Sequence, residues 1–292
     1  MSIMTQLEFA LDFSTSEKSL AKYILENGNL VLDLSIKELA SNTYTSPATI
    51  VRLCKKLGLQ GYFEFKIKYS AELQFDQSTK DKIDVNYPFN AQDTTASIIH
   101  NIASLHKETI DDTVKLIDYQ EIDRIAQILL KARNIFILGH GNSIVSAQSF
   151  QHRMMRIGRP VIINTVAGEQ HYMAEMITKE DAAIVISYSG ETTEVVSYAK
   201  LLKDKNIACI GITSVGDNQL NHVVSHVIHT CSREKIFLKI APFSSNISIE
   251  YILDILFSVI FQQNHHYNLN RKIMYDKKVD DRHAKLSPIN ND

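Results

Sequence analysis

The sequence predicts an α/β protein with two domains: an all-α helix-turn-helix domain at the N-terminus and a doubly wound parallel-sheet domain at the C-terminus. Residues 14 to 75 show helical spacing of apolar residues and several helix-start signals. From Asn134 onward, short β-branched runs alternate with helical segments, as in a parallel sheet covered by helices on both faces. A polar stretch separates the two patterns, and 292 residues suffice for two domains. We therefore expect a helix-turn-helix domain at 1–76, a linker at 77–94, an α-β-α domain at 95–265 and a polar, loosely held tail at 266–292.

The composition indicates a globular protein without a secretory or membrane segment. Hydrophobic residues make up 45% of the chain and charged residues 22%. The N-terminus carries Glu8 and Asp12 and lacks a basic start followed by an apolar core, and no apolar run approaches the ~20 residues that span a membrane. Cys54, Cys209 and Cys231 are widely spaced beside apolar runs, which fits reduced thiols better than disulfides or a metal site. We expect a cytoplasmic protein with no metal, no cofactor and no membrane partner.

Helix-start signals divide the N-terminal domain into short helices. Ser14–Glu17 and Ser35–Glu38 have the form of a capping box, in which a Ser oxygen and a Glu three residues later satisfy free backbone amides. Ser46-Pro47 opens a third helix, since Ser is a good N-cap and Pro suits the first helical position. Gly58 ends that helix as a left-handed residue would, and a further helix is expected from Gly61 to Leu73.

The second and third of these helices have the order and spacing of a helix-turn-helix, with Ile36–Ala40, a tight connection at 41–45, and then Ser46–Leu57. On a helical wheel, the apolar side chains of the third helix gather on one face and its polar side chains on the opposite arc. A helix that enters the major groove needs this division. The apolar face holds Ile50, Leu53, Cys54 and Leu57, and the polar arc holds Ala48, Thr49, Arg52, Lys55 and Lys56.

Charge is concentrated in the same region, although the net charge of the whole chain is only −2. Residues 46 to 69 include five basic residues and one acid, a local charge of +4. Thr49 and Arg52 could reach base edges, and Lys55 and Lys56 could meet phosphates. Taken alone, an ordinary amphipathic helix with a basic surface explains the pattern equally well. The predicted DNA-binding residues are Ser46, Thr49, Arg52, Lys55 and Lys56.

The C-terminal domain is predicted from short apolar runs and from two longer helical segments. The expected strands are Ile135–Leu138, Val161–Ile163, Ala183–Ser187, Ala208–Ile212 and Val227–Thr230, and the helical segments are 96–132 and Tyr251–Phe261.

Two strand ends carry loops suited to an anion. Gly139–Ser143 follows the first strand, and its glycines let backbone amides approach a ligand. Ser187–Thr192 follows the third strand and places hydroxyls and a glycine at the start of the helix Thr193–Lys203, which suits a phosphate. Ligands of open α/β sheets bind at such carboxyl ends. The alternative is that these hydroxyls only cap a helix, and two loops at strand ends favour the phosphate site over it.

Other side chains could complete this pocket. Lys235, Lys239 and Ser244-Ser245 precede the last long helix and could close it. His140 and Glu169 lie near it in the sequence and could act as an acid or a base, although such residues in loops are more often simple polar contacts.

Residues 9 to 261 resemble the RpiR family of phosphosugar-responsive transcription regulators. The N-terminal likeness is carried by Ser35-Ile-Lys-Glu-Leu-Ala40, by Ser46-Pro-Ala-Thr-Ile-Val-Arg-Leu-Cys-Lys-Lys-Leu-Gly58 and by Gly61-Tyr-Phe-Glu-Phe-Lys66. The C-terminal likeness is to the sugar isomerase (SIS) domain, through Gly139-x-Gly141-x-Ser143, Ser187-x-Ser189-Gly190-Glu191-Thr192 and Ile210-Gly-Ile-Thr-Ser214.

The resemblance implies a SIS domain that dimerises and holds a phosphosugar between the two loops, and a helix-turn-helix that reads a palindromic operator. Ligand-binding roles then pass to Gly141, Ser143, Ser187, Ser189 and Thr192. The chain departs from the family pattern at two positions. Tyr44 stands where the turn of the helix-turn-helix usually holds glycine, so it must be left-handed or the turn must differ. Asn246 stands where an Arg often follows the paired serines, which bears on the identity of the ligand.

Three function classes compete at this stage. The first is a DNA-binding regulator of carbohydrate metabolism genes, with a repressor favoured and an activator left open, controlled by a sugar phosphate and acting as a homodimer or tetramer. The second is a SIS-type phosphosugar isomerase or etherase, for which Glu169 is the candidate base. The third is a dinucleotide-binding domain, which the missing third glycine after Gly141 disfavours. An enzyme has little use for residues 14 to 75, so the sequence favours the regulator without turnover.

Overall fold

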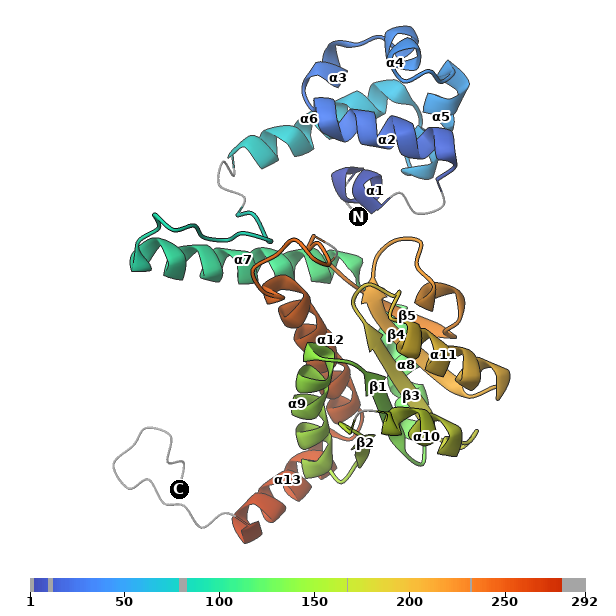
Figure 1. The fold of residues 1–292 in the computed structure, drawn as a ribbon, viewed down its shortest axis with the longest axis vertical. Coiled ribbons are helices and arrows are strands. Elements are labelled where there is room, and N and C mark those ends of the chain that lie inside the picture. Colours follow the sequence, from blue (N-terminus) through green and yellow to red (C-terminus); the bar gives the residue numbers. More distant parts are fainter. Residues whose placement is uncertain (1–2, 10–12, 79–82, 167, 232, 280–292) are drawn as a thin grey trace. The chain divides into compact units, whose positions relative to one another are not determined.

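The computed structural model describes residues 3–9, 13–78, 83–166, 168–231 and 233–279, which form two compact units (Figure 1). One unit comprises Met1–Asn101 with Val215–Asp217, and the other comprises Ile102–Ser214 with Asn218–Asp292. Each unit has its own apolar core. The boundaries proposed from the sequence stay predictions. Within the predicted linker, helix α6 extends to Ser78, and residues 83–94 form turns without helix or strand.

The N-terminal unit is helical, and its helices begin where the sequence places caps. Ser14 and Ser35 form complete capping boxes with Glu17 and Glu38, and Gly58 is left-handed with φ 75°. Buried apolar side chains from all of the larger helices meet in one core, among them Leu20, Leu39 and Leu53. The helices are α1 (Ile3–Phe9), α2 (Thr15–Asn27), α3 (Leu30–Asp33), α4 (Ile36–Asn42), α5 (Pro47–Lys56) and α6 (Tyr62–Ser78).

The C-terminal unit is built on a five-stranded parallel sheet in the order β2-β1-β3-β4-β5. The chain runs from β1 to one edge and then returns past β1 to the other edge, which confirms the doubly wound fold. β1 and β3 are buried along their whole length, because helices cover both faces of the sheet. The strands are β1 (Ile135–Gly139), β2 (Val161–Ile163), β3 (Ala182–Ser187), β4 (Ala208–Ser214) and β5 (His226–Thr230).

The helices form a layer on each side of this sheet (Figure 1). Ile135 and Ile137 of β1 belong to the core beneath α8, α9 and α12, whereas Phe136 and Leu138 belong to the core beneath α10 and α11. This alternation follows from the two-residue period of a strand. The helices are α7 (Thr95–Leu116), α8 (Tyr119–Lys131), α9 (Asn142–Arg156), α10 (Glu169–Met176), α11 (Thr193–Asp204), α12 (Phe243–Gln263) and α13 (His265–Val279), with a 3₁₀ turn at Leu220–His222.

Several helix boundaries differ from the predictions. The helical segment 96–132 is two helices, because the Asp118 carboxylate accepts the Gln120 and Glu121 amides and starts α8 afresh. Residues up to Val279 are helical, so the prediction of a loosely held tail from 266 is wrong for that part. Asn268 anchors α13 by donating to the Phe261 carbonyl oxygen at 2.9 Å. Residues 280–292 of the predicted tail lie outside the described residues.

Helix α12 begins at Phe243, earlier than predicted, and among the described residues it is the one helix long and apolar enough, by length and composition, to cross a membrane. Within the unit it serves as a core helix. Ile252, Leu253 and Leu256 are fully buried, and α12 packs against α8 and α9. A helix buried inside a domain needs this apolar character as much as a membrane span does.

Candidate functional site

The first candidate site is the helix-turn-helix formed by α4 and α5. Tyr44 in the connecting turn has φ 51° and is 99% exposed, which confirms that a non-glycine residue takes the left-handed conformation there. The Thr45 amide donates to the Ala40 carbonyl oxygen at 2.9 Å, and the Thr43 hydroxyl donates to the Leu39 carbonyl oxygen at 2.7 Å. These bonds hold the turn tightly, so α4 and α5 are fixed relative to each other.

Helix α5 has the buried apolar face that its sequence predicts. Ser46 is its N-cap and accepts from the Thr49 amide at 3.2 Å, and Pro47 opens the helix. Ile50, Leu53 and Cys54 are buried in the core of the unit.

The opposite arc of α5 agrees with the prediction only in part. Arg52, Lys55 and the capping Ser46 are exposed. The exposed position expected for Thr49 is wrong, since it is 6% exposed and its hydroxyl lies 3.0 Å from the Ser46 hydroxyl. Polar side chains at the start of a helix form hydrogen bonds that satisfy its free backbone amides, and a helical wheel does not show these bonds. Arg52 donates to the Thr49 hydroxyl at 3.3 Å, so Thr49 supports a surface residue instead of forming the surface.

Lys56 has a partner inside the protein. Its Nζ lies 2.8 Å from Oε2 of Glu17, whose side chain is 4% exposed. Burial alone would raise the pKa of Glu17, but the hydrogen bonds from Lys56 and Ser14 outweigh burial and lower this pKa. Lys56 is exposed as well, but its ion pair stabilises the junction of α2 and α5, which leaves Arg52 and Lys55 as the cations of the helix to test for DNA contact.

The second candidate site is a pocket of ≈ 200 Å³ in the C-terminal unit. It lies at the carboxyl ends of β1 and β3, where the winding of the sheet changes direction. Four of the five predicted ligand residues line it, namely Ser143, Ser187, Ser189 and Thr192. Its remaining lining residues are His140, Ile186, Tyr188, Ile236 and Lys239. Gly141 is not among them and instead precedes α9 as its N-cap, with φ 56°.

Residues 187–192, which we call the phosphate loop, are held by their own hydroxyls. The Ser187 and Thr192 hydroxyls lie 3.0 Å apart, and Ser187 and Ser189 accept from the amides of Gly190 and Glu191 at 3.2 Å each. Thr192 is the N-cap of α11 and its side chain makes no capping hydrogen bond. The positive end of α11 therefore faces the pocket with hydroxyls around it, an arrangement that suits an anion.

Lys239 supplies the positive charge of the pocket. Its Nζ lies 2.8 Å from Oε2 of the buried Glu234 and 5.2 Å from the centre of the Tyr188 ring. The sequence named Lys239 as a candidate, and the structure places it in the pocket. The sequence did not single out Tyr188 and Ile236. Tyr188 lies inside the predicted loop, but only the fold brings Ile236 to it.

Other candidates lie elsewhere. Lys235 and Glu169 are exposed and do not line the pocket. Ser244 and Ser245 are 1% and 3% exposed and are bonded to Glu234 at the start of α12. The expectations that Lys235 and these serines close the pocket and that Glu169 serves it as a base are therefore wrong. Glu169 lies in the first turn of α10, and Ser244 and Ser245 lie in the first turn of α12.

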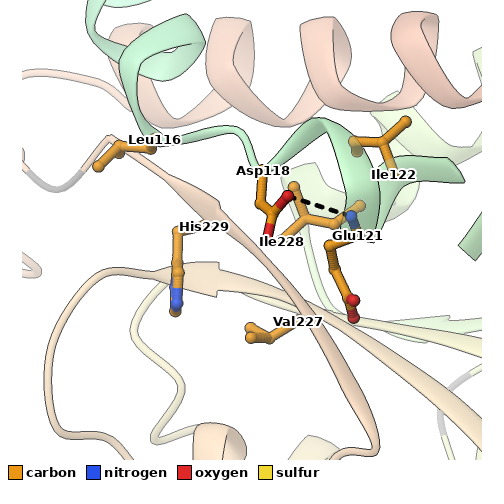
Figure 2. A pocket seen from close by; sticks show the side chains of 7 residues that line it. All are labelled: Leu116, Asp118, Glu121, Ile122, Val227, Ile228 and His229. Atoms are coloured by element: carbon orange, nitrogen blue, oxygen red, sulfur yellow. Dashed lines mark hydrogen bonds between the residues drawn. The ribbon is translucent and has the colours of Figure 1, made fainter. Parts of the chain in front are cut away.

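A larger cavity of ≈ 280 Å³ lies between the start of α8 and strand β5 (Figure 2). Its two carboxylates are already used within the protein, since Asp118 caps α8 and Glu121 is 2.7 Å from His226. Among the described residues, Nδ1 of His229 has no hydrogen-bond partner, and burial lowers the pKa of this side chain. The smaller pocket combines several hydroxyls with a helix N-terminus and Lys239, so it is the better candidate site for an anion.

Comparison with known proteins identifies the two domains that contain these candidate sites. The sequence model of the helix-turn-helix domain of the rpiR family matches residues 1–76, and that of the SIS domain matches residues 128–258. An uncharacterized HTH-type transcriptional regulator of Caldanaerobacter subterraneus is 31% identical over 258 residues, which are 88% of this chain and 89% of that protein.

The chain belongs to the RpiR family of helix-turn-helix transcriptional regulators.

Solved structures agree with this RpiR-family assignment. The NanR protein of Vibrio vulnificus, solved with ManNAc-6P, is 26% identical with a TM-score of 0.59, covering 94% of this chain and 97% of that one. The sugar isomerase domain of an RpiR transcription factor from Sphaerobacter thermophilus has a TM-score of 0.54 at 13% identity, covering 61% of this chain and 98% of that one, and so shares the fold. The chain is thus a DNA-binding regulator with a SIS domain.

Proposed function

We propose that this RpiR-family protein controls carbohydrate metabolism genes and that a sugar phosphate in the SIS pocket controls its binding to DNA. The observation that carries the proposal is the phosphate loop at the start of α11, with Lys239 beside it. A phosphate monoester has about two negative charges and three acceptor oxygens. Hydroxyl donors, helix amides and one ammonium group match these needs.

The polar walls of the pocket favour a sugar over a bare phosphate. Ser143 and His140 line it beside the phosphate loop and can bond to hydroxyls. NanR, which is similar over nearly the whole chain, was solved with ManNAc-6P. An N-acylated hexosamine phosphate is therefore the first ligand to test.

The proposal assigns binding without turnover to this pocket. An isomerase needs a base that moves a proton between neighbouring carbons. Within the described ranges, no carboxylate lines the pocket. His140 lies 3.9 Å from the exposed Glu194, and both side chains are open to solvent. The enzyme alternative predicts conversion of a sugar phosphate by the purified protein, which proton NMR would detect.

The helix-turn-helix would bind operator DNA through α5. Arg52 and Lys55 are exposed on the face of α5 opposite its buried side chains, so we assign base reading to Arg52 and phosphate contact to Lys55. In this proposal a cytoplasmic homodimer places two such helices on a palindromic site and represses transcription.

A thermal-shift screen against sugar phosphates tests the ligand. Binding to the folded state alone adds ~2.7 kcal/mol of stability at a hundredfold excess over the Kd. We expect N-acetylmannosamine 6-phosphate or a related ester to raise the melting temperature, and unphosphorylated N-acetylmannosamine to have no effect. Ser189→Ala should remove the shift while DNA binding persists. A shift that survives in this variant would contradict the assigned loop.

An operator assay tests the DNA site. Arg52→Ala should weaken binding to a duplex selected by the wild-type protein by ~1–3 kcal/mol, if Arg52 contacts a base. Binding of the variant at wild-type strength would exclude Arg52 from the reading surface.

A further inference from the structure

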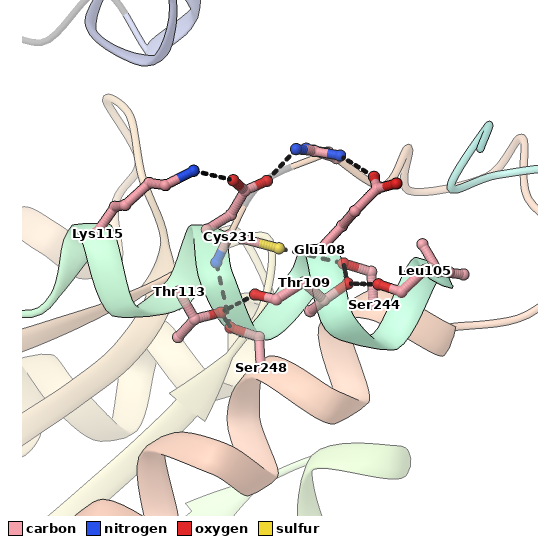
Figure 3. Close-up of polar contacts among 10 residues, drawn as sticks. Leu105, Glu108, Thr109, Thr113, Lys115, Cys231, Ser244 and Ser248 are labelled. Carbon is pink, nitrogen blue, oxygen red and sulfur yellow. Dashed lines mark hydrogen bonds and ion pairs between the residues drawn. The ribbon is translucent and has the colours of Figure 1, made fainter. Parts of the chain in front are cut away.

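The segment that follows β5, residues 231–239, contacts several functional parts of the C-terminal unit. We call it the post-β5 segment; residue 232 is not among its described residues. Glu234 and Lys239 reach the phosphate loop, Arg233 reaches α7, and Cys231 reaches α12. Part of this arrangement is visible in Figure 3, where the side chains of α7, α12 and Cys231 meet.

Glu234 fixes the start of α12. The residue before this helix is Pro242, whose side chain cannot cap it. The fully buried Glu234 carboxylate takes that role: it accepts from the Ser244 amide, from the Ser245 amide at 3.0 Å and from the Ser245 hydroxyl at 2.7 Å. Lys239 balances its charge at 2.8 Å. Moving Lys239 therefore leaves a buried carboxylate with less compensation, which is costly.

The pocket and Glu234 are joined in two ways. The Tyr188 hydroxyl donates to the Glu234 carbonyl oxygen and accepts from the Glu234 amide, both at 3.0 Å. Lys239 lines the pocket and at the same time pairs with Glu234. A dianionic phosphate in the pocket would compete with Glu234 for this ammonium group.

The neighbouring Arg233 holds α7. Its guanidinium pairs with Glu108 at 3.0 Å and with Asp112. These two carboxylates are four residues apart on one face of α7, where like charges repel. Arg233 offsets that repulsion, so any shift of Arg233 acts directly on α7.

Helix α7 is also joined to α12 by two buried hydroxyl pairs. Thr109 donates to the Ser244 hydroxyl at 2.9 Å, and the Thr113 and Ser248 hydroxyls lie 2.8 Å apart (Figure 3). Cys231 contacts the same two serines, through its Sγ at 3.1 Å and its amide at 3.2 Å. A buried donor or acceptor that loses its partner costs free energy. A displacement of the post-β5 segment should therefore shift α7 and α12 together.

Helix α7 continues into the other unit along the chain. Its residues up to Asn101 belong to the N-terminal unit, and those from Ile102 onward belong to the C-terminal unit. We propose that the post-β5 segment couples ligand occupancy of the pocket to α7. In this coupling Glu234 positions Lys239 in the pocket, and Arg233 binds α7 through its two ion pairs. The identity of the ligand rests on the proposed function, but the mechanical link between the phosphate loop and α7 does not.

A ligand-free experiment tests the link by itself. Tyr188→Phe removes the hydroxyl that joins the phosphate loop to Glu234. We expect this variant to increase hydrogen–deuterium exchange of the α7 amides at 105–113 in the full-length protein. Ser197→Ala removes an exposed hydroxyl on α11 that donates to the Glu194 carbonyl oxygen in its own turn, and should leave α7 unchanged. Unchanged α7 exchange in Tyr188→Phe would overturn the proposal, whatever the ligand is.

Operator binding with and without N-acetylmannosamine 6-phosphate tests the regulatory consequence. The ratio of the two operator Kd values measures the coupling, usually a factor of about 5 to 150. Arg233→Gln should bring this ratio close to 1 while it still binds the ligand, and Arg233→Lys should restore part of it. Arg133→Gln is the matched control, because Arg133 also pairs with two carboxylates, Glu180 and Asp181, and should keep the wild-type ratio.

The outcomes separate the two proposals. A full ratio in Arg233→Gln overturns the coupling role. A wild-type protein that does not respond to this ester overturns the ligand proposed for the pocket, and the exchange experiment then decides the link.

Discussion

Tyr44 lies in the turn of the helix-turn-helix with a positive φ and a side chain that touches almost nothing. A left-handed backbone costs a non-glycine residue ~1–2 kcal/mol, and glycine loses ~0.4–1 kcal/mol through its freer unfolded chain. Tyr44→Gly should therefore raise the unfolding free energy by up to ~1 kcal/mol, measured by urea denaturation. Tyr44→Ala keeps the strain and is the control. Equal stability of the two variants would show that backbone strain is not the cause.

Two adjacent lysines on α5 should behave differently. Lys55→Ala should weaken operator binding and reduce the slope of log K against log salt by ~0.9, because one phosphate contact is lost. Lys56→Ala removes the partner of the buried Glu17 and should instead lower stability by ~1 kcal/mol. Salt titrations and urea denaturation of both variants distinguish the roles. A reduced salt slope with unchanged stability in Lys56→Ala would place this lysine on DNA.

Asp181, just before β3, gives the C-terminal unit a defined acid sensitivity. Burial would raise the pKa of its carboxyl, but hydrogen bonds from Thr178, Arg133 and Asn134 lower this pKa from 3.8 to about 2. Because the folded pKa is below the unfolded one, the stabilisation is complete above pH 3.8 and is lost as the pH falls through about 2.

Asp181→Asn should remove this pH dependence. The variant should be less stable than wild type by ~1–3 kcal/mol at neutral pH, with the difference shrinking towards pH 2. Urea denaturation between pH 6 and pH 2 measures it, and a difference that stays constant would contradict the assignment.

At the scale of elements, short-range signals were enough for most of the fold. The capping boxes at Ser14 and Ser35 and the apolar runs of the strands act within a few residues, so a sequence shows them directly. Helix α3 has no such signal. It is held by Tyr62, which donates to the Val31 carbonyl oxygen at 3.1 Å from another helix. Such contacts form only after the chain has folded.

The site shows the same division. The phosphate loop was predicted because its hydroxyls lie in one run of sequence. The role of Glu234 was not, because the amides it caps lie ten and eleven residues later and Tyr188 lies 46 residues earlier. Thr49 was misplaced because a helical wheel gives direction but not the hydrogen bonds of a helix start.

The phosphate loop depends on one glycine. Gly190 has φ 68°, and a Cβ there would lie 2.1 Å from Oδ1 of Asn218. Gly190→Ala should therefore cost more than ~2 kcal/mol and abolish ligand binding. Gly141→Ala has the same backbone strain at φ 56° but open space around its Cβ, so it should cost only ~1 kcal/mol. Thermal denaturation of both variants measures this, and equal losses would exclude the contact with Asn218 as the cause.

At the scale of the whole molecule, α7 is the helix that both units share along the chain. One alanine inserted between Asn101 and Ile102 turns the parts on either side by about 100°, whereas seven residues change the phase by only about 20°. We expect the single insertion to keep ligand binding and DNA binding but to lose the effect of one on the other, and the seven-residue insertion to recover it. Operator titrations with and without ligand measure this. Full coupling after the single insertion would mean that helix phase carries no signal.

The three buried cysteines allow the opening of each unit to be timed separately. Burial raises the pKa of Cys54 in the N-terminal unit to about 11, and in the C-terminal unit it raises the pKa of Cys209 to about 12 and that of Cys231. Since only the thiolate reacts, a thiol-specific dye should modify each cysteine only when its surroundings open. Mass spectrometry of the labelled peptides, with and without sugar phosphate or DNA, would then show in which unit each ligand reduces the rate of opening.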